Sequence, residues 1–128
     1  MNIAFLCVLI ISLFPFLMAG FAKYGGAQAG RRFDNNHPRA WLSGLEGWPQ
    51  RAHAAQMNSW EALPIFVAAV LMAKVAVVPA ATLDFWAVWF VLARVLYAGL
   101  YITDRASLRS VVWVLGMIAP VRLMIAAM

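Results

Sequence analysis

One stretch of this sequence combines a serine-rich helix start with an arginine, which suits it to binding an anion. In Ser107-Leu108-Arg109-Ser110, Ser107 is expected to cap a helix whose free N–H groups and positive dipole end lie beside Arg109. Such surroundings lower the pKa of a thiol and so favour the thiolate. The alternative interpretation is a helix start that satisfies only its own backbone.

Two further sets of polar residues lie within apolar sequence at helical spacing. Arg51, Asn58 and Glu61 stand at i, i+7 and i+10, so on a helix they share roughly one face. Ionised groups at membrane depth cost about 3 kcal/mol or more each, so they tend to be paired and functional. The first set is therefore a candidate binding face.

The second set is Arg94, Tyr97 and Tyr101, at i, i+3 and i+7, again on one face. We expect an ion pair inside the membrane between Glu61 and Arg94. Two plainer interpretations stay open. The pair can simply hold helices together, and the tyrosines can serve only as anchors at the membrane interface.

The elements that position these residues are expected to cross a membrane. The 128-residue chain is 65% hydrophobic and only 12% charged, whereas about a quarter of the residues in a soluble domain are charged. The net charge of +5 comes without a basic stripe, so it indicates membrane topology and no nucleic-acid partner. The single Cys7 and the separated His37 and His53 predict neither a disulfide nor a metal site.

The pattern predicts an all-α bundle of four transmembrane helices in one domain over residues 1–128. The helices are expected at about 3–22, 49–78, 82–101 and 108–127, joined by a polar loop and two short links. For the first apolar run a cleaved signal peptide is the alternative, but the opening Met1-Asn2-Ile3 has no basic residue, which favours a retained span.

Basic residues in the loops predict the orientation of the chain. Lys23, Arg31, Arg32 and Arg39 lie in the first loop, and Arg105 lies in the third. By the positive-inside rule, loops one and three are expected in the cytoplasm and both termini on the periplasmic side.

The stretch from Arg51 onwards resembles a known signature. Arg51, then Asn58-x-x-Glu61, then Pro64-x-Phe66 resembles the helix-two signature of MAPEG proteins, the membrane-associated proteins in eicosanoid and glutathione metabolism.

A second signature of the same family follows further along the chain. Residues 93–101, with Arg94, Tyr97 and Tyr101, followed by Arg109-Ser110, are similar to it. Residues 38–41, Pro-Arg-Ala-Trp, resemble the bacterial branch.

The resemblance implies a homotrimer of four-helix bundles in a bacterial inner membrane, surrounded by lipid, with glutathione bound between subunits. It implies a glutathione-dependent transferase or peroxidase acting on a lipophilic small molecule, with Arg109 and Ser110 catalytic. The implied glutathione-binding positions are Arg51, Asn58, Glu61, Arg94, Tyr97 and Tyr101. Met57 and Gln56 stand where many glutathione-using relatives carry a basic residue and a histidine, so weaker capture of the tripeptide is expected.

Two other functions are alternatives to the enzyme. Some family members bind lipid without catalysis, so a lipid-binding or scaffold protein of the same fold is the main alternative. A four-helix multidrug transporter fits less well, because such transporters resemble one another in having a carboxylate in helix one, and residues 3–22 contain none.

Overall fold

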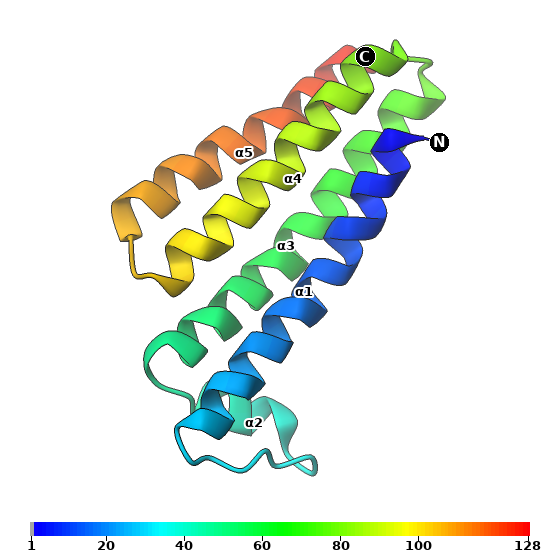
Figure 1. Cartoon of the computed structure of the whole chain (residues 1–128). Coiled ribbons are helices and arrows are strands. Elements are labelled where there is room, and N and C mark those ends of the chain that lie inside the picture. The colour runs from blue at the N-terminus through cyan, green and yellow to red at the C-terminus, as the bar shows by residue number, and fades with distance from the viewer. Residues whose placement is uncertain (1) are drawn as a thin grey trace.

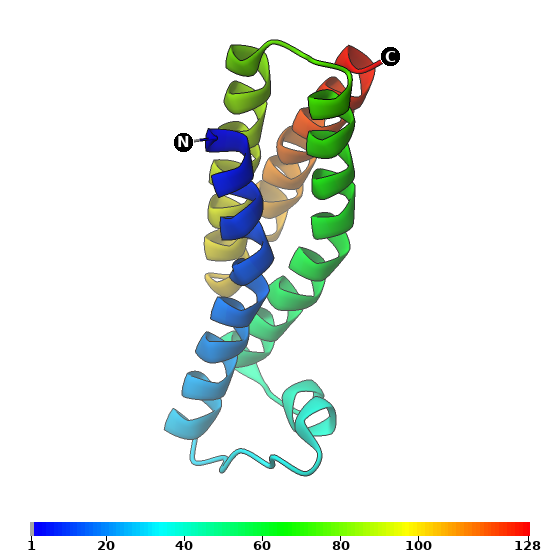
Figure 2. The same cartoon turned by 90° about the vertical axis from the view of Figure 1, so that its right-hand side faces the viewer.

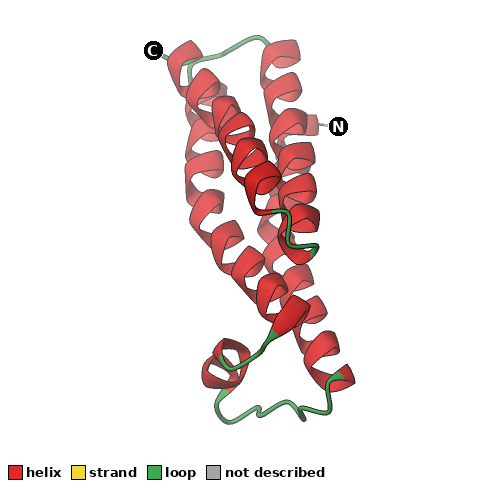
Figure 3. Ribbon diagram, turned by 90° about the vertical axis from the view of Figure 1, so that its left-hand side faces the viewer, coloured by secondary structure: helices red, strands yellow, loops and turns green. Residues whose placement is uncertain are grey.

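The alternation of apolar runs and polar breaks along the chain produces five α-helices. A computed structural model describes residues 2–128, in which no strand is present (Figures 1 and 3). The helices are α1 (Ile3–Gln28), α2 (Pro38–Ser43), α3 (Gly47–Val75), α4 (Ala80–Ile102) and α5 (Ala106–Ala126). Four of them, all but α2, are long and apolar enough to cross a membrane. The predicted all-α fold with four spans is confirmed.

The four long helices run alternately up and down. Both termini and the α3–α4 link lie at one end of the bundle, and α2 with its loops lies at the other (Figure 1). The short α4–α5 link is at the α2 end of its two helices, so loops one and three share an end, as a four-span topology requires. We call this the α2 end.

Small residues let the helices pack closely around an aromatic centre. The rings of Phe66 and Phe90 stack with centroids 4.2 Å apart, and both side chains are fully buried between α3 and α4. Ala69, Ala73 and Ala87 are also fully buried, which brings the backbones close together as in other membrane bundles. In each span, at most 33% of the most apolar 18-residue stretch is buried inside the chain. The rest of this apolar surface must therefore face lipid or another subunit.

The structure corrects the predicted helix bounds. Helix α1 ends at Gln28 instead of Ala22, and α3 occupies Gly47–Val75 instead of 49–78. Helices α4 and α5 each begin two residues earlier than predicted. The short α2 was not predicted, although Pro38 at its first turn is a recognised start signal.

The last turn of α1 contains two glycines against which α2 and the start of α3 pack. A methyl group on Gly25 would lie 2.5 Å from Pro49 Cγ, and one on Gly26 would lie 2.5 Å from Trp41 Cη2. Trp41 itself is buried against this turn of α1. Glycine is unfavourable within a helix, but here close contact with α2 and the start of α3 outweighs that preference.

This packing predicts that Gly26→Ala lowers the thermal unfolding midpoint of the protein in detergent. The added methyl group has to displace the Trp41 ring, and overpacking of this kind costs about 1–3 kcal/mol. Gly20→Ala is the matched control, since nothing lies within 4 Å of its Cβ position on the same helix. We expect its midpoint to be unchanged or slightly higher. Equal loss in both variants would contradict the predicted packing.

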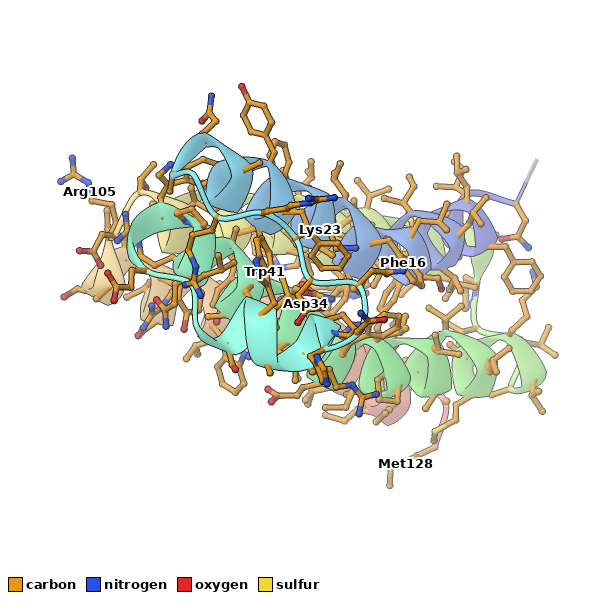
Figure 4. The ribbon with its side chains drawn as sticks, turned by 90° about the horizontal axis from the view of Figure 1, so that it is seen from below. Phe16, Lys23, Asp34, Trp41, Arg105 and Met128 are labelled. Atoms are coloured by element: carbon orange, nitrogen blue, oxygen red, sulfur yellow. The ribbon has the colours of Figure 1, made fainter. Side chains whose placement is uncertain are left out.

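A local turn orders the loop between α1 and α2. The Asp34 carboxylate accepts hydrogen bonds from the Asn36 N–H at 2.9 Å and from the His37 side chain at 3.1 Å. These bonds, that to Asn36 first, hold the pKa of Asp34 below its usual value. Because folding lowers the pKa of Asp34, these hydrogen bonds stabilise the folded protein at pH values above the ordinary aspartate pKa. That stabilisation is lost as the pH falls through the lowered pKa. Asp34 and Trp41 are seen from the α2 end in Figure 4.

Candidate functional site

The polar face of α3 opens onto a cavity near the α2 end. The cavity has a volume of about 430 Å³, and its walls come from α3, α4 and the last residue of α2. The side chains around it are Ser43, Gln50, His53, Ala54, Met57, Asn58, Glu61, Tyr97 and Tyr101. Within it, Asn58 Nδ2 donates a hydrogen bond to Glu61 Oε2 at 3.3 Å. Four of the predicted site residues are thereby brought together.

A second cavity adjoins the first at the start of α5. It has a volume of about 310 Å³ and is lined by Asn58, Tyr97, Arg109, Ser110, Trp113 and Val114. Because Asn58 and Tyr97 line both cavities, the two form one continuous polar site. Six of the eight predicted residues line this site.

One polar atom in the site has no partner. The side-chain oxygen of Asn58, Oδ1, is buried and accepts no hydrogen bond from residues 2–128. A buried acceptor without a partner is unfavourable by about 1–3 kcal/mol. Since Asn58 lines both cavities, this oxygen is suited to accept an N–H from a molecule bound there.

Two arginines flank a pair of tyrosine rings beside the site. The guanidinium of Arg94 lies 4.4 Å from the centre of the Tyr97 ring, and that of Arg109 lies 4.0 Å from the Tyr101 ring. The two rings meet edge to face with centroids 5.7 Å apart. Cation–π contacts of this kind contribute about 0.5–2 kcal/mol each. They fix Arg109, on α5, against α4.

The predicted ion pair between Glu61 and Arg94 is wrong. The single salt bridge within residues 2–128 joins His37 and Asp34. Arg94 is only 3% exposed and donates to Ser59 Oγ at 3.2 Å, whereas Glu61 is exposed. Residues two apart on a helix point about 200° apart. Where Ser59 meets Arg94, the Glu61 carboxylate therefore lies farther from that guanidinium, on the side of α3 that lines the cavity with Tyr97 and Tyr101.

Arg51 and Arg94 are not among the side chains that line the two cavities. Arg51 Nε donates to the carbonyl oxygen of Ile102 at 2.9 Å, which satisfies a free carbonyl in the last turn of α4. Its backbone position is on the expected face, but its long side chain reaches sideways to α4. In this structure both arginines hold helices together around the site.

The start of α5 differs from the prediction in one respect. Its N-cap is Arg105 with no side-chain hydrogen bond, so Ser107 lies inside the first turn and does not cap it. The Ser110 hydroxyl donates to the carbonyl oxygen of Ala106 at 3.1 Å. Of the two predicted catalytic residues, only Arg109 therefore has free donors towards the cavity.

Several lining residues were not predicted from the sequence. Gln50, His53 and Met57 fall on the same helical face as Asn58 and Glu61, so extending that face by two turns would have found them. Ser59 gave no signal of its own, because a serine in a membrane helix commonly bonds its own backbone, as it also does here with Ala55.

A family model shows what kind of protein carries this site. The model described as MAPEG family matches residues 3–128. No curated protein and no solved structure gives a significant match. Since the family match covers all four spans and every residue of the site, the chain belongs to the MAPEG family.

Proposed function

We propose that this protein is a membrane-bound, glutathione-dependent transferase or peroxidase that acts on lipophilic electrophiles or lipid hydroperoxides. The family includes glutathione transferases and peroxidases. The observation that carries the proposal is the continuous site in which the free Asn58 oxygen, Glu61 and Arg109 meet at the α2 end.

The residues of the site fit the groups of glutathione. The tripeptide has amide N–H groups, an ammonium, two carboxylates and a thiol. Asn58 Oδ1 needs an N–H donor, and the exposed Glu61 carboxylate suits an ammonium. Arg109 offers donors to an anionic group at the far side of Asn58. We place the glutathione backbone along Asn58 between the two cavities.

Arg109 is the residue that would activate the thiol. Glutathione, when bound, supplies the thiolate. The sulfur either forms a bond to an electrophilic carbon as that carbon's leaving group departs, or, together with a second glutathione, is oxidised to the disulfide while a hydroperoxide is reduced to an alcohol and water. A guanidinium beside a thiol favours the thiolate, which is the nucleophilic form. Contact with the Tyr101 ring keeps Arg109 in place, so no reorganisation is needed as charge develops on the sulfur.

The apolar wall of the second cavity supports a lipophilic partner substrate. Trp113 and Val114 line it and are 41% and 57% exposed on the outer face of α5. A substrate dissolved in the bilayer can therefore approach Arg109 from the side, across Trp113, without passing through water.

An activity screen on the purified protein tests the proposal. With glutathione and either an electrophilic aromatic or a lipid hydroperoxide, we expect thiol-dependent turnover at least tenfold above that of Arg109→Ala protein. Glutathione binding without turnover on any such substrate, or no binding at all, would contradict the proposal. Either result would favour a non-catalytic lipid-binding or scaffold protein of the same fold.

The same proposal includes a homotrimer. Glu61 is exposed in the single chain although it lies on a transmembrane helix, and facing acyl chains would cost it about 3 kcal/mol or more. A neighbouring subunit over this face of α3 would remove that cost and close the site.

The bacterial inner membrane is the proposed location, with the α2 end in the cytoplasm. The cations at that end are Lys23, Arg31, Arg32, Arg39, Arg51, Arg105 and Arg109. Those towards the other end are Lys74 and Arg122. The excess at the α2 end supports this orientation.

A further inference from the structure

An apolar groove lies between α4 and α5, apart from the polar site. It has a volume of about 220 Å³ and is lined by Trp89, Leu92, Ala93, Leu96, Val112 and Leu115. We call it the α4–α5 groove. None of its residues lines either cavity of the polar site, and none belongs to α3. Figure 2 shows α5 at the back of the bundle, behind α1 and α3.

The groove and the polar site lie on opposite sides of α5. At about 100° per residue, Val112 and Leu115 point to one side of this helix, whereas Ser110, Trp113 and Val114 point to the other. Leu92 and Leu96, on the α4 wall of the groove, are 64% and 54% exposed. The groove is thus an apolar surface of its own at membrane depth.

A row of side chains joins the groove to Arg122. The Arg122 guanidinium lies 6.0 Å from the centre of the Trp86 ring, and the rings of Trp86 and Trp89 have centroids 6.2 Å apart. Trp89 Nε1 donates a hydrogen bond to the carbonyl oxygen of Leu115 at 2.9 Å, which fixes its ring across α4 and α5. Since Leu115 and Arg122 are seven residues apart, they share one side of α5.

Arg122 lies at the depth of lipid headgroups. It is four residues before the end of α5 at Ala126, about 6 Å along the axis, so its long side chain can extend to the membrane surface. The neighbouring Trp86 and Trp89 are of the type that gathers at this interface. Leu115 is about 10 Å deeper than Arg122, so the groove continues from the cation towards the bilayer centre.

Arg122 has no carboxylate partner in the protein. It is exposed, and the one salt bridge within residues 2–128 joins His37 and Asp34. The side-chain carboxylate nearest in depth is Asp84, which accepts the N–H of Ala4 from α1 at 3.1 Å. Asp84 and Trp86 are two residues apart, so Asp84 points away from the groove.

An anion from outside the protein is therefore the complement of Arg122. Of the other acidic residues, Glu61 is midway along α3, and the remaining three are Asp34, Glu46 and Asp104 at the α2 end. A second copy of this chain thus offers no further side-chain carboxylate at the depth of Arg122. The phosphate of a lipid lies at that depth, with its acyl chains directly below.

We infer that the α4–α5 groove binds an anionic phospholipid of the leaflet opposite the α2 end, with its phosphate on Arg122 and an acyl chain along Leu92 and Leu115. The cation, the tryptophan pair and the apolar groove follow one another in the order in which a phospholipid presents its headgroup, interface and chain. This binding is independent of the thiol chemistry proposed for the polar site.

Native mass spectrometry of detergent-purified protein tests the inference, with phosphatidylglycerol and phosphatidylcholine of the same acyl chains as probes. We expect phosphatidylglycerol to bind at one molecule per chain and more tightly than phosphatidylcholine. Arg122→Gln should weaken phosphatidylglycerol binding about tenfold, since a charge-assisted bond is lost. Lys74→Gln is the matched control, because Lys74 is an exposed cation towards the same end, outside the groove. Its affinity should equal that of the wild type.

The acyl chain is tested separately by Leu92→Ala, which should weaken phosphatidylglycerol binding about fivefold through lost apolar contact. Val95→Ala is its control, since Val95 is 50% exposed on the same helix but does not line the groove. Both side chains are exposed, so folding should be preserved. Glutathione titration should be unchanged in Arg122→Gln and Leu92→Ala.

Four results would overturn the inference. The first is equal binding of the two lipids, and the second is equal loss in Arg122→Gln and Lys74→Gln, which would indicate only general attraction to basic protein. The third is wild-type binding in Leu92→Ala. The fourth is complete displacement by glycerol phosphate at a concentration similar to that of the lipid, because the acyl chain would then contribute nothing.

Discussion

Replacing Arg109 by alanine is expected to lower the turnover number of the thiol-dependent reaction about a hundredfold, with a much smaller change in glutathione affinity. Removal of a single donor to a developing anion typically has an effect of this size. The guanidinium of Arg109 lies in the site, 4.0 Å from the centre of the Tyr101 ring, and the proposed placement of glutathione puts the thiol beside it. Steady-state kinetics with glutathione varied separate the two effects.

Arg105→Ala is the matched control for this prediction. Arg105 precedes α5, is exposed, and its side chain points away from the bundle in Figure 4. We expect its turnover to equal that of the wild type. If Arg109→Ala retained full turnover, or if both variants lost activity equally, Arg109 would have no specific role in activating the thiol.

Replacing Asn58 by alanine is expected to weaken glutathione binding about tenfold while leaving turnover at saturation nearly unchanged. The variant removes the free acceptor Oδ1 and also the hydrogen bond that steadies Glu61. A loss of one or two hydrogen bonds to charged partners corresponds to about a tenfold change in affinity or more. Isothermal titration calorimetry with glutathione measures it.

Asn35→Ala is the control for the amide. Asn35 is exposed in the loop between α1 and α2 and is not among the residues that line the two cavities of the glutathione site. Its affinity for glutathione should remain that of the wild type. A wild-type affinity for glutathione in Asn58→Ala would show that Asn58 Oδ1 does not contact the ligand. The proposed placement of the tripeptide would then be wrong.

The sequence was sufficient to predict the spans, but it was a poor guide to their ends. Runs of about 20 apolar residues are a strong signal because every backbone polar group in lipid must be bonded within a helix. The end of α1 was missed because Gly25 and Gly26 normally indicate a break. Only the folded structure shows Trp41 and Pro49 seated against them. Contacts between distant segments decided this helix end.

The sequence predicted which residues line the candidate site better than it predicted the contacts between them. Helical spacing correctly grouped Asn58 with Glu61, and Tyr97 with Tyr101, around one cavity. Spacing within a helix does not fix how two helices are rotated against each other. The rotation of α3 that brings Ser59 to Arg94 leaves Glu61 on the outer side, so the ion pair expected between oppositely charged residues does not form.

A continuous row of side-chain contacts joins the buried Arg94 to Arg109 in the site. Arg94 is buried, and its contact with Tyr97 continues through Tyr101 to Arg109. Arg94 thus supports Arg109, the residue proposed to activate the thiol.

Ultraviolet difference spectroscopy of the purified protein during titration with glutathione tests the central claim most directly, since it detects thiolate formed in the site. For the wild type we predict a saturable thiolate absorbance at a pH well below the ordinary thiol pKa, and for Arg109→Ala saturable binding with little of this absorbance. Binding of glutathione by the wild type without any thiolate signal, or the same signal in both proteins, would contradict the account.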